Sequence, residues 1–207
     1  MPPPRTTTSA RFMGAGVRYH GRLMTAQQIF ARALKTFRVL WFALTVSNLL
    51  LGLVTFLVPS RAAHPPDATM WQFFAALGAG LAVASFVVPA RMYSRSIAGR
   101  EPPQITAAEP TPDGSRGAAR FAQPELAARA AMPAALTPFI LSMALSETVS
   151  VLGLQLHMLG YAPTITMPFI VVGTVLAASR FPTVARLVGR YERLHGASFA
   201  ASEGGSY

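Results

Sequence analysis

Four long apolar runs constrain this chain more than any other feature of its sequence. They comprise residues 39–58, 70–90, about 134–158 and 161–179. Each is close to the ~20 residues that a helix needs to cross ~30 Å of hydrocarbon. Backbone groups in a bilayer must find hydrogen-bond partners within the protein, so each run is predicted to be a helix. The sequence therefore predicts an all-α bundle of four transmembrane helices, arranged as two hairpins.

The basic residues give this bundle an orientation. Seven lie before residue 39, six lie between residues 91 and 129, and four follow residue 179, whereas Arg61 alone lies in the other connections. Because cytoplasmic loops carry an excess of Lys and Arg, both termini and the long loop are predicted to be cytoplasmic. We expect a multi-pass protein of the bacterial inner (plasma) membrane. A cleaved signal peptide is a less favoured interpretation of the first run, which is too long and follows too long a leader.

Composition agrees with a membrane location and excludes several site classes. The chain is 52% hydrophobic and only 13% charged, against about 25% charged residues in soluble domains. It has no cysteine, so disulfides and thiolate metal sites are excluded. Its net charge of +10 would suit nucleic acid, but the basic residues flank apolar runs. We therefore expect the lipid bilayer, and no nucleic acid, as a partner.

The remaining segments divide the chain into six parts. The sequence predicts a disordered basic cytoplasmic tail (1–22), an amphipathic interfacial helix (23–38), a first transmembrane hairpin (39–90), a cytoplasmic Pro/Ala-rich linker (91–133), a second hairpin (134–179) and a cytoplasmic tail (180–207). Thr25 and Gln28 fit a capping box at the start of the amphipathic segment. That segment has an equally acceptable interpretation as a simple cytoplasmic extension of the first span.

Glu147 is the residue most in need of an explanation, because it lies within the third apolar run. A charged carboxylate at mid-bilayer costs about 2.5–3.5 kcal/mol on insertion scales. Burial favours the neutral acid, so Glu147 is predicted to carry a proton for much of the time. Ser150 and Asn48 are its candidate partners in a proton- or ion-binding site. The alternative is that Glu147 only anchors the packing of helices by a hydrogen bond.

Small and polar residues near Glu147 recur at helical spacing. On the third span these are Ser142, Ser146, Ser150, Gly153 and His157. On the second span Ala76, Gly80 and Ala84 recur every four residues. Such stripes let helices approach closely, so both are predicted to be helix-packing surfaces and routes of self-association, or of association with another membrane protein.

Recognisable catalytic signatures are absent from the sequence. It contains no HExxH, Walker, GxSxG or calcium-loop motif, and its four histidines are scattered. One carboxylate without a second acid, a nucleophile or a metal set is insufficient for an intramembrane enzyme. We therefore expect no catalytic residues, no metal and no cofactor.

Two resemblances add expectations. Residues 75–159, with AALGAGLAVA at 75–84 and Gln123-Pro124 ahead of Glu147, partially resemble the proteolipid subunit c of rotary ATP synthases. That resemblance implies a proton-carrying role for Glu147. Gln123-Pro124 lies farther from the carboxylate than in that family, and two further spans flank the hairpin. Over its full length the chain is similar to small uncharacterised four-helix bacterial membrane proteins, through residues 144–154 and Phe181-Pro182, which implies an inner-membrane bundle without a stated activity.

Overall fold

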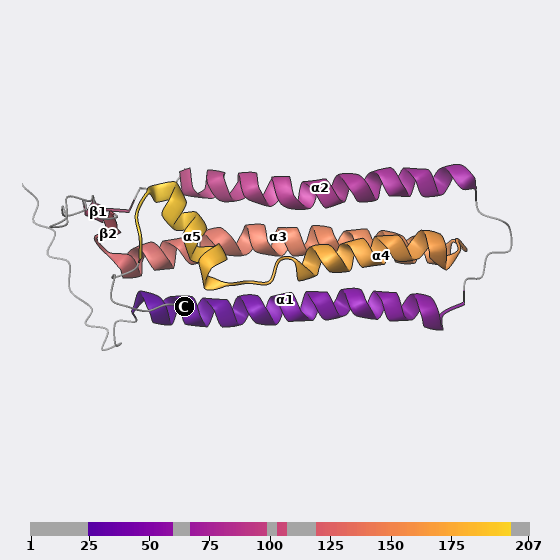
Figure 1. Cartoon of the computed structure of the whole chain (residues 1–207), viewed down its shortest axis with the longest axis horizontal. Coiled ribbons are helices and arrows are strands. Elements are labelled where there is room, and N and C mark those ends of the chain that lie inside the picture. Colours follow the sequence, from indigo (N-terminus) through magenta and orange to yellow (C-terminus); the bar gives the residue numbers. More distant parts are fainter. Residues whose placement is uncertain (1–24, 60–66, 99–102, 107–118, 200–207) are drawn as a thin grey trace, which may run out of the picture.

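Three long helices run side by side along most of the length of the molecule, and a shorter fourth helix lies beside them over part of that length (Figure 1). The structure is a computed structural model and describes residues 25–59, 67–98, 103–106 and 119–199. The helices are α1 (Ala26–Leu57), α2 (Ala68–Ala98), α3 (Pro124–Met158) and α4 (Pro163–Ala178). Helix α3 is central and packs against each of the other three, whereas α2 and α4 contact each other little. The predicted all-helical bundle is confirmed.

The surface and the interior of this bundle have the polarity of a membrane protein. Large apolar side chains are exposed along its helices, among them Phe42, Phe56, Phe73, Val83 and Val175. Serine, threonine, asparagine and histidine side chains are buried between the helices. Helices α1, α2 and α3 are long and apolar enough to cross a membrane, and α4 is apolar but shorter. Apolar helices with an apolar surface are what a bilayer, and not water, stabilises.

Helix α1 is continuous through the boundary that the sequence suggested at residue 38. Its start is the predicted one: Thr25 caps it, and Thr25 and Gln28 make both hydrogen bonds of a capping box. From there α1 runs without interruption to Leu57. Residues 26–38 are thus part of α1 and not a separate helix, which agrees with the alternative of an extension of the first apolar run.

Helix α3 begins ten residues earlier than predicted, so the expected linker 91–133 is partly helical. Pro124 takes the first turn of α3, where proline leaves no hydrogen bond unmade. Buried alanines, including Ala127, Ala128 and Ala131, then let neighbouring helices approach. The middle of the linker, residues 107–118, lies outside the described residues, as do the predicted tail 1–22 and residues 200–207.

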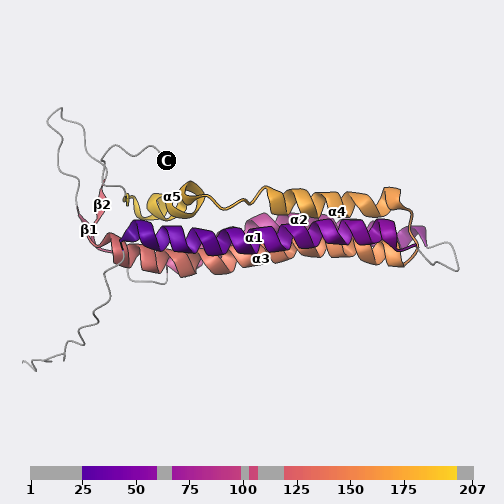
Figure 2. The same ribbon diagram turned by 90° about the horizontal axis from the view of Figure 1, so that it is seen from below.

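A fifth helix and a short strand pair complete this end of the molecule. Helix α5 (Val184–His195) follows α4 along one side of the bundle, as Figure 2 shows. Strands β1 (Ile105–Thr106) and β2 (Arg120–Phe121) pair antiparallel. Phe121 of β2 is buried and its ring lies 4.4 Å from Phe199 and 5.7 Å from Tyr191. This aromatic cluster ties α5 to the extended ends of α1, α2 and α3.

His195 makes this aromatic cluster sensitive to acid. Its ring lies 4.5 Å from that of Tyr191, and desolvation by burial lowers the pKa of His195 below its usual 6.5. The folded state therefore favours neutral His195, and its contribution to stability is lost as pH falls below about 6.5. We expect the protection of α5 amides, that is, their hydrogen exchange corrected for the intrinsic slowing of exchange in acid, to fall between pH 7 and 5.5. His195→Phe should remove most of that pH dependence, and an unchanged profile would contradict the assignment.

Candidate functional site: polar clusters inside the helix bundle

Glu147 is joined to α1 by a short hydrogen bond. It lies half-buried on α3, and the Ser47 hydroxyl donates to Glu147 Oε1 at 2.6 Å. Within the described residues this is the only hydrogen bond of the carboxylate, and no second titratable side chain is hydrogen-bonded to it. The arrangement can hold α1 against α3, and it leaves Oε2 without a partner.

The partners expected for Glu147 lie elsewhere. Asn48 is fully buried, but its Nδ2 donates to Leu44 O of its own helix at 3.0 Å. Ser150 is also fully buried and donates to Ile170 O of α4 at 3.5 Å. Neither hydrogen-bonds Glu147, so the structure does not bring these three residues together as one site. The actual partner, Ser47, was not predicted.

The small-residue stripe of α3 is the surface on which α4 packs. Ser146 and Ser150 are fully buried and lie against Gly173, while Gly153 lies beneath Thr166 and Ile170. A Cβ on Gly153 would be 2.8 Å from Thr166 O, and one on Gly173 would be 2.7 Å from Ser146 O. The two backbones are therefore in direct contact, the close approach that small residues permit within membranes.

The stripe of small residues predicted on α2 does not lie on the face of α2 that packs against the other helices. Ala76 and Gly80 are exposed, Ala84 is half-buried, and a Cβ on Gly80 would meet nothing within 4 Å. Helix α2 instead approaches its neighbours at Gly78, where a Cβ would be 3.0 Å from the Phe169 ring, and at buried Ser85. The prediction that Ala76, Gly80 and Ala84 pack within the bundle is thus corrected.

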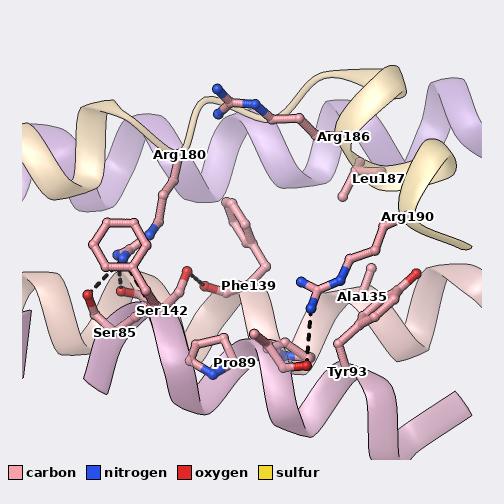
Figure 3. Close-up of a pocket in the computed structure, with 13 residues that line it drawn as sticks. Ser85, Pro89, Tyr93, Ala135, Phe139, Ser142, Arg180, Arg186, Leu187 and Arg190 are labelled. Atoms are coloured by element: carbon pink, nitrogen blue, oxygen red, sulfur yellow. Dashed lines mark hydrogen bonds between the residues drawn. The ribbon is translucent and has the colours of Figure 1, made fainter. Parts of the chain in front are cut away.

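Arg180 forms a second polar cluster, which the sequence did not predict. Its Nη2 donates to Ser85 Oγ at 2.8 Å and to Ser85 O at 3.0 Å, and its Nη1 donates to Ser142 O at 2.6 Å and to Ser146 Oγ. Figure 3 shows the side chain reaching from the end of α4 toward Ser85 and Ser142. One guanidinium thus ties α2 and α3 to the segment after α4.

The two charged groups of the bundle interior are not paired with each other. Arg180 reaches Ser146, whereas Glu147, the next residue of α3, reaches Ser47 on α1. Successive helical residues point about 100° apart, so the two sites lie on different faces of α3. The side-chain partners of Arg180 are serine oxygens and the Phe86 ring, 4.7 Å from the guanidinium carbon.

Side chains satisfy the backbone where α4 ends. Trp41 Nε1 donates to Ala177 O at 2.8 Å, and Arg186 Nη1 donates to Ser179 O at 2.6 Å. Terminal carbonyls of a helix need such partners, above all where water is scarce. These contacts explain how the chain can leave the helix at Ser179, after the 16 residues of α4, and turn Arg180 inward.

Polar side chains also join the helices at the opposite end of the bundle. His157, predicted to lie near the outer end of the third span, has its Nε2 2.7 Å from Val58 O at the end of α1. Tyr161 donates to Asp67 O beside the start of α2. The Thr69 backbone N–H donates to Asp67 Oδ1 at 2.8 Å and lowers the pKa of that carboxyl. These contacts join the described ends of α1, α2 and α3.

Within the described part of the chain no three His, Asp or Glu side chains lie close enough to hold a metal ion. Comparison with protein-family models, with curated proteins and with solved structures gives no match for the chain. The resemblances to subunit c and to small four-helix bacterial proteins therefore stay predictions. What the fold and the polar clusters define is a class: a helical bundle with an apolar surface and a hydrogen-bonded polar interior.

Proposed function

We propose that the chain is an integral protein of the bacterial inner membrane, with α1 to α4 as its spans and the α5 end in the cytoplasm. The exposed apolar side chains along α1, α2 and α4 support the membrane location. The described basic residues on α1, α2, α3 and α5 all fall at the end of the bundle where α5 lies (Figure 1), which supports the orientation. At about 1.5 Å per residue the 16 residues of α4 cover about 24 Å, less than the ~30 Å of hydrocarbon, so α4 needs its flanking residues to complete the crossing.

Within that membrane the protein has a non-catalytic structural or assembly role, in which Glu147 anchors helix packing. The Ser47–Glu147 hydrogen bond of 2.6 Å carries this proposal. This hydrogen bond joins α1 to α3. Within the described residues, Glu147 is hydrogen-bonded to no further group that could pass a proton onward. Self-association, or association with another membrane protein, remains a prediction for such a role.

A double-mutant cycle on Ser47 and Glu147 tests the anchor. We expect Ser47→Ala and Glu147→Leu, neither of which leaves both partners of the bond, each to reduce the free energy of unfolding by about 1 kcal/mol, typical of one hydrogen bond between membrane helices. The double variant should cost less than the two single variants together, because both remove the same bond. Unfolding in mixed detergent micelles measures all three.

The matched control is Thr148→Ala on the same helix. Thr148 is exposed and its hydroxyl donates only to Ala144 O of its own helix, so its removal should change stability by less than about 0.5 kcal/mol. Additive losses in the double variant would show that Ser47 and Glu147 do not act together and would count against the anchor.

A second candidate, a proton- or ion-responsive protein, is favoured by one observation. Glu147 is only half-buried and its Oε2 has no hydrogen-bond partner in the described residues, so the carboxyl group is accessible at that atom. Carbodiimide attacks protonated carboxyls in apolar surroundings. Labelling of Glu147 above pH 7, with a proton leak in liposomes that Glu147→Gln abolishes, would favour this candidate over the anchor.

A further inference from the structure

A basic pocket lies beside Arg180, between α2, α3 and the segment that connects α4 with α5. Its volume is about 230 Å³. Three arginines, Arg180, Arg186 and Arg190, line it together with aromatic and apolar side chains, and no acidic residue is among its lining residues. Figure 3 shows Arg180 and Arg190 entering from one side, toward Ser85 and Tyr93 of α2. A cavity with this concentration of uncompensated positive charge is suited to an anion.

The three arginines differ in how far the protein already uses them. Arg180 has both terminal nitrogens bonded to serine residues. Among the described residues Arg190 makes one hydrogen bond, from Nη2 to Ala90 O at 3.1 Å, and its guanidinium carbon lies 4.6 Å from the centre of the Tyr93 ring. In the same part of the chain Arg186 uses only Nη1 of its side chain. A guanidinium has five N–H donors, so Arg186 and Arg190 retain donors for a ligand while Arg180 is held in place.

The position of the pocket relates it to the membrane surface. Trp41 contacts Ala177, three residues before Arg180, and tryptophan is enriched where spans meet headgroups. On the membrane side of the pocket, α2 exposes Val83 and Phe86, which are 63% and 56% accessible. The arginines therefore lie where a headgroup phosphate would be, next to a surface suited to acyl chains.

We propose that this pocket binds the phosphodiester group of an anionic phospholipid from the inner leaflet. Arg190 binds the phosphate oxygens through paired N–H donors, the geometry in which arginine recognises phosphate, and Arg186, whose guanidinium lies against Ser179 O and Phe181 O, adds positive charge at the rim of the pocket. Arg180 adds fixed positive charge, and the acyl chains lie along α2 over Val83 and Phe86. Basic pockets between spans on the cytoplasmic side are suited to anionic headgroups. This inference rests on the membrane location proposed above.

The same phosphate chemistry occurs in soluble anions, but the surroundings favour a lipid. Besides the arginines, the pocket is lined largely by apolar groups such as Pro89, Ala135 and Phe139. Its volume is below the ~300–1,000 Å³ typical of sites that enclose a whole small molecule. A headgroup phosphate needs only the polar part of such a pocket, because its tails stay in the bilayer.

Native mass spectrometry of the full-length protein tests the proposal. Phosphatidylglycerol, zwitterionic phosphatidylethanolamine and soluble glycerol phosphate are titrated separately. We expect phosphatidylglycerol to bind about tenfold more tightly than phosphatidylethanolamine, and glycerol phosphate to bind far more weakly than either lipid. Arg190→Gln should weaken phosphatidylglycerol binding about tenfold, and Arg186→Gln/Arg190→Gln should remove the preference between the two lipids.

The matched control is Arg193→Gln, which removes the same charge from the same helix at an exposed residue outside the pocket. It should change lipid binding less than about twofold. Arg190→Lys keeps the charge and should lie between wild type and Arg190→Gln, which keeps the test decisive if the double variant folds poorly.

Three results would overturn the proposal: equal binding of both lipids to the wild type, an equal loss in Arg193→Gln, or glycerol phosphate binding as tightly as phosphatidylglycerol. The last would assign the pocket to a soluble phosphate. A separate experiment tests the proposed membrane location: cell membranes are extracted with alkaline carbonate. An integral protein stays in the pellet whichever lipid it binds, so this result does not depend on the lipid proposal.

Discussion

Gly173→Ala is expected to lower the free energy of unfolding by about 3 kcal/mol, the upper end of the usual range for overpacked interiors. The added Cβ would be 2.7 Å from Ser146 O and 2.9 Å from Ser150 N, and closer still to Ser150 Oγ. The first two atoms belong to the backbone of α3 and cannot rotate away. Helices α3 and α4 would have to separate along the surface where they are in closest contact.

Two further alanine substitutions make this test specific. Gly153→Ala should also be destabilising, because its Cβ would be 2.8 Å from Thr166 O. Gly80→Ala is the control: its Cβ meets nothing within 4 Å, so the variant should be neutral or more stable by about 0.5–1 kcal/mol, the helix preference for alanine. Denaturation of each variant in mixed micelles measures the differences. If Gly173→Ala matched Gly80→Ala, α3 and α4 would be less closely packed than the structure has them.

The apolar runs of the sequence predicted the helices well, because hydropathy reports the solvent that a surface faces. Residues 39–58 and 70–90 fall within or at the ends of α1 and α2, and 161–179 encloses α4. Among the helix ends beyond the runs, the start of α1 was predicted from its capping box, whereas the end of α2 and the start of α3 were not. Residues 124–133 are rich in alanine and contain two prolines, a composition typical of linkers, and they form a helix because α3 packs there against its neighbours.

The stripe on α2 was misplaced for a geometric reason. A four-residue spacing advances about 40° per step around a helix, whereas a seven-residue spacing returns to within about 20° of its start. Gly78 and Ser85, the real contact, are seven residues apart. Gly80 lies two residues, or about 200°, from Gly78 and therefore on the opposite side. Composition alone does not say which face of a uniformly apolar helix meets the protein.

The site was half-predicted for similar reasons. Glu147 is recognisable as an interior carboxylate because it interrupts an apolar run, but its partner depends on the rotation of α1: Ser47 and not the adjacent Asn48 faces it. Arg180 follows the last apolar run, a position from which arginine ordinarily extends to water. Its inward direction depends on serines from two other helices, which no local pattern reveals.

Arg180→Lys is expected to lower the free energy of unfolding by about 2–3 kcal/mol, although it keeps the positive charge. The planar guanidinium divides its donors between Ser85 on α2 and the pair Ser142 and Ser146 on α3. A lysine ammonium is a single point and can satisfy only one of the two helices. Because α2 and α4 contact each other little, this bridge is an important connection between α2 and the segment after α4.

The serine hydroxyls limit the size of this effect and make its origin testable. Ser85 Oγ also donates to Ala82 O, and Ser146 Oγ to Ser142 O, so both keep a partner when the guanidinium is lost. The expected cost therefore comes from the lost bridge and from a partly buried cation left with fewer acceptors. Arg193→Lys, at an exposed position of α5, should change stability by less than about 0.5 kcal/mol. Denaturation in mixed micelles, with hydrogen exchange in α5, compares the two variants. Equal stability of Arg180→Lys and wild type would mean that the positive charge alone, and not the shape of the guanidinium, holds α2 and α3 to the segment after α4.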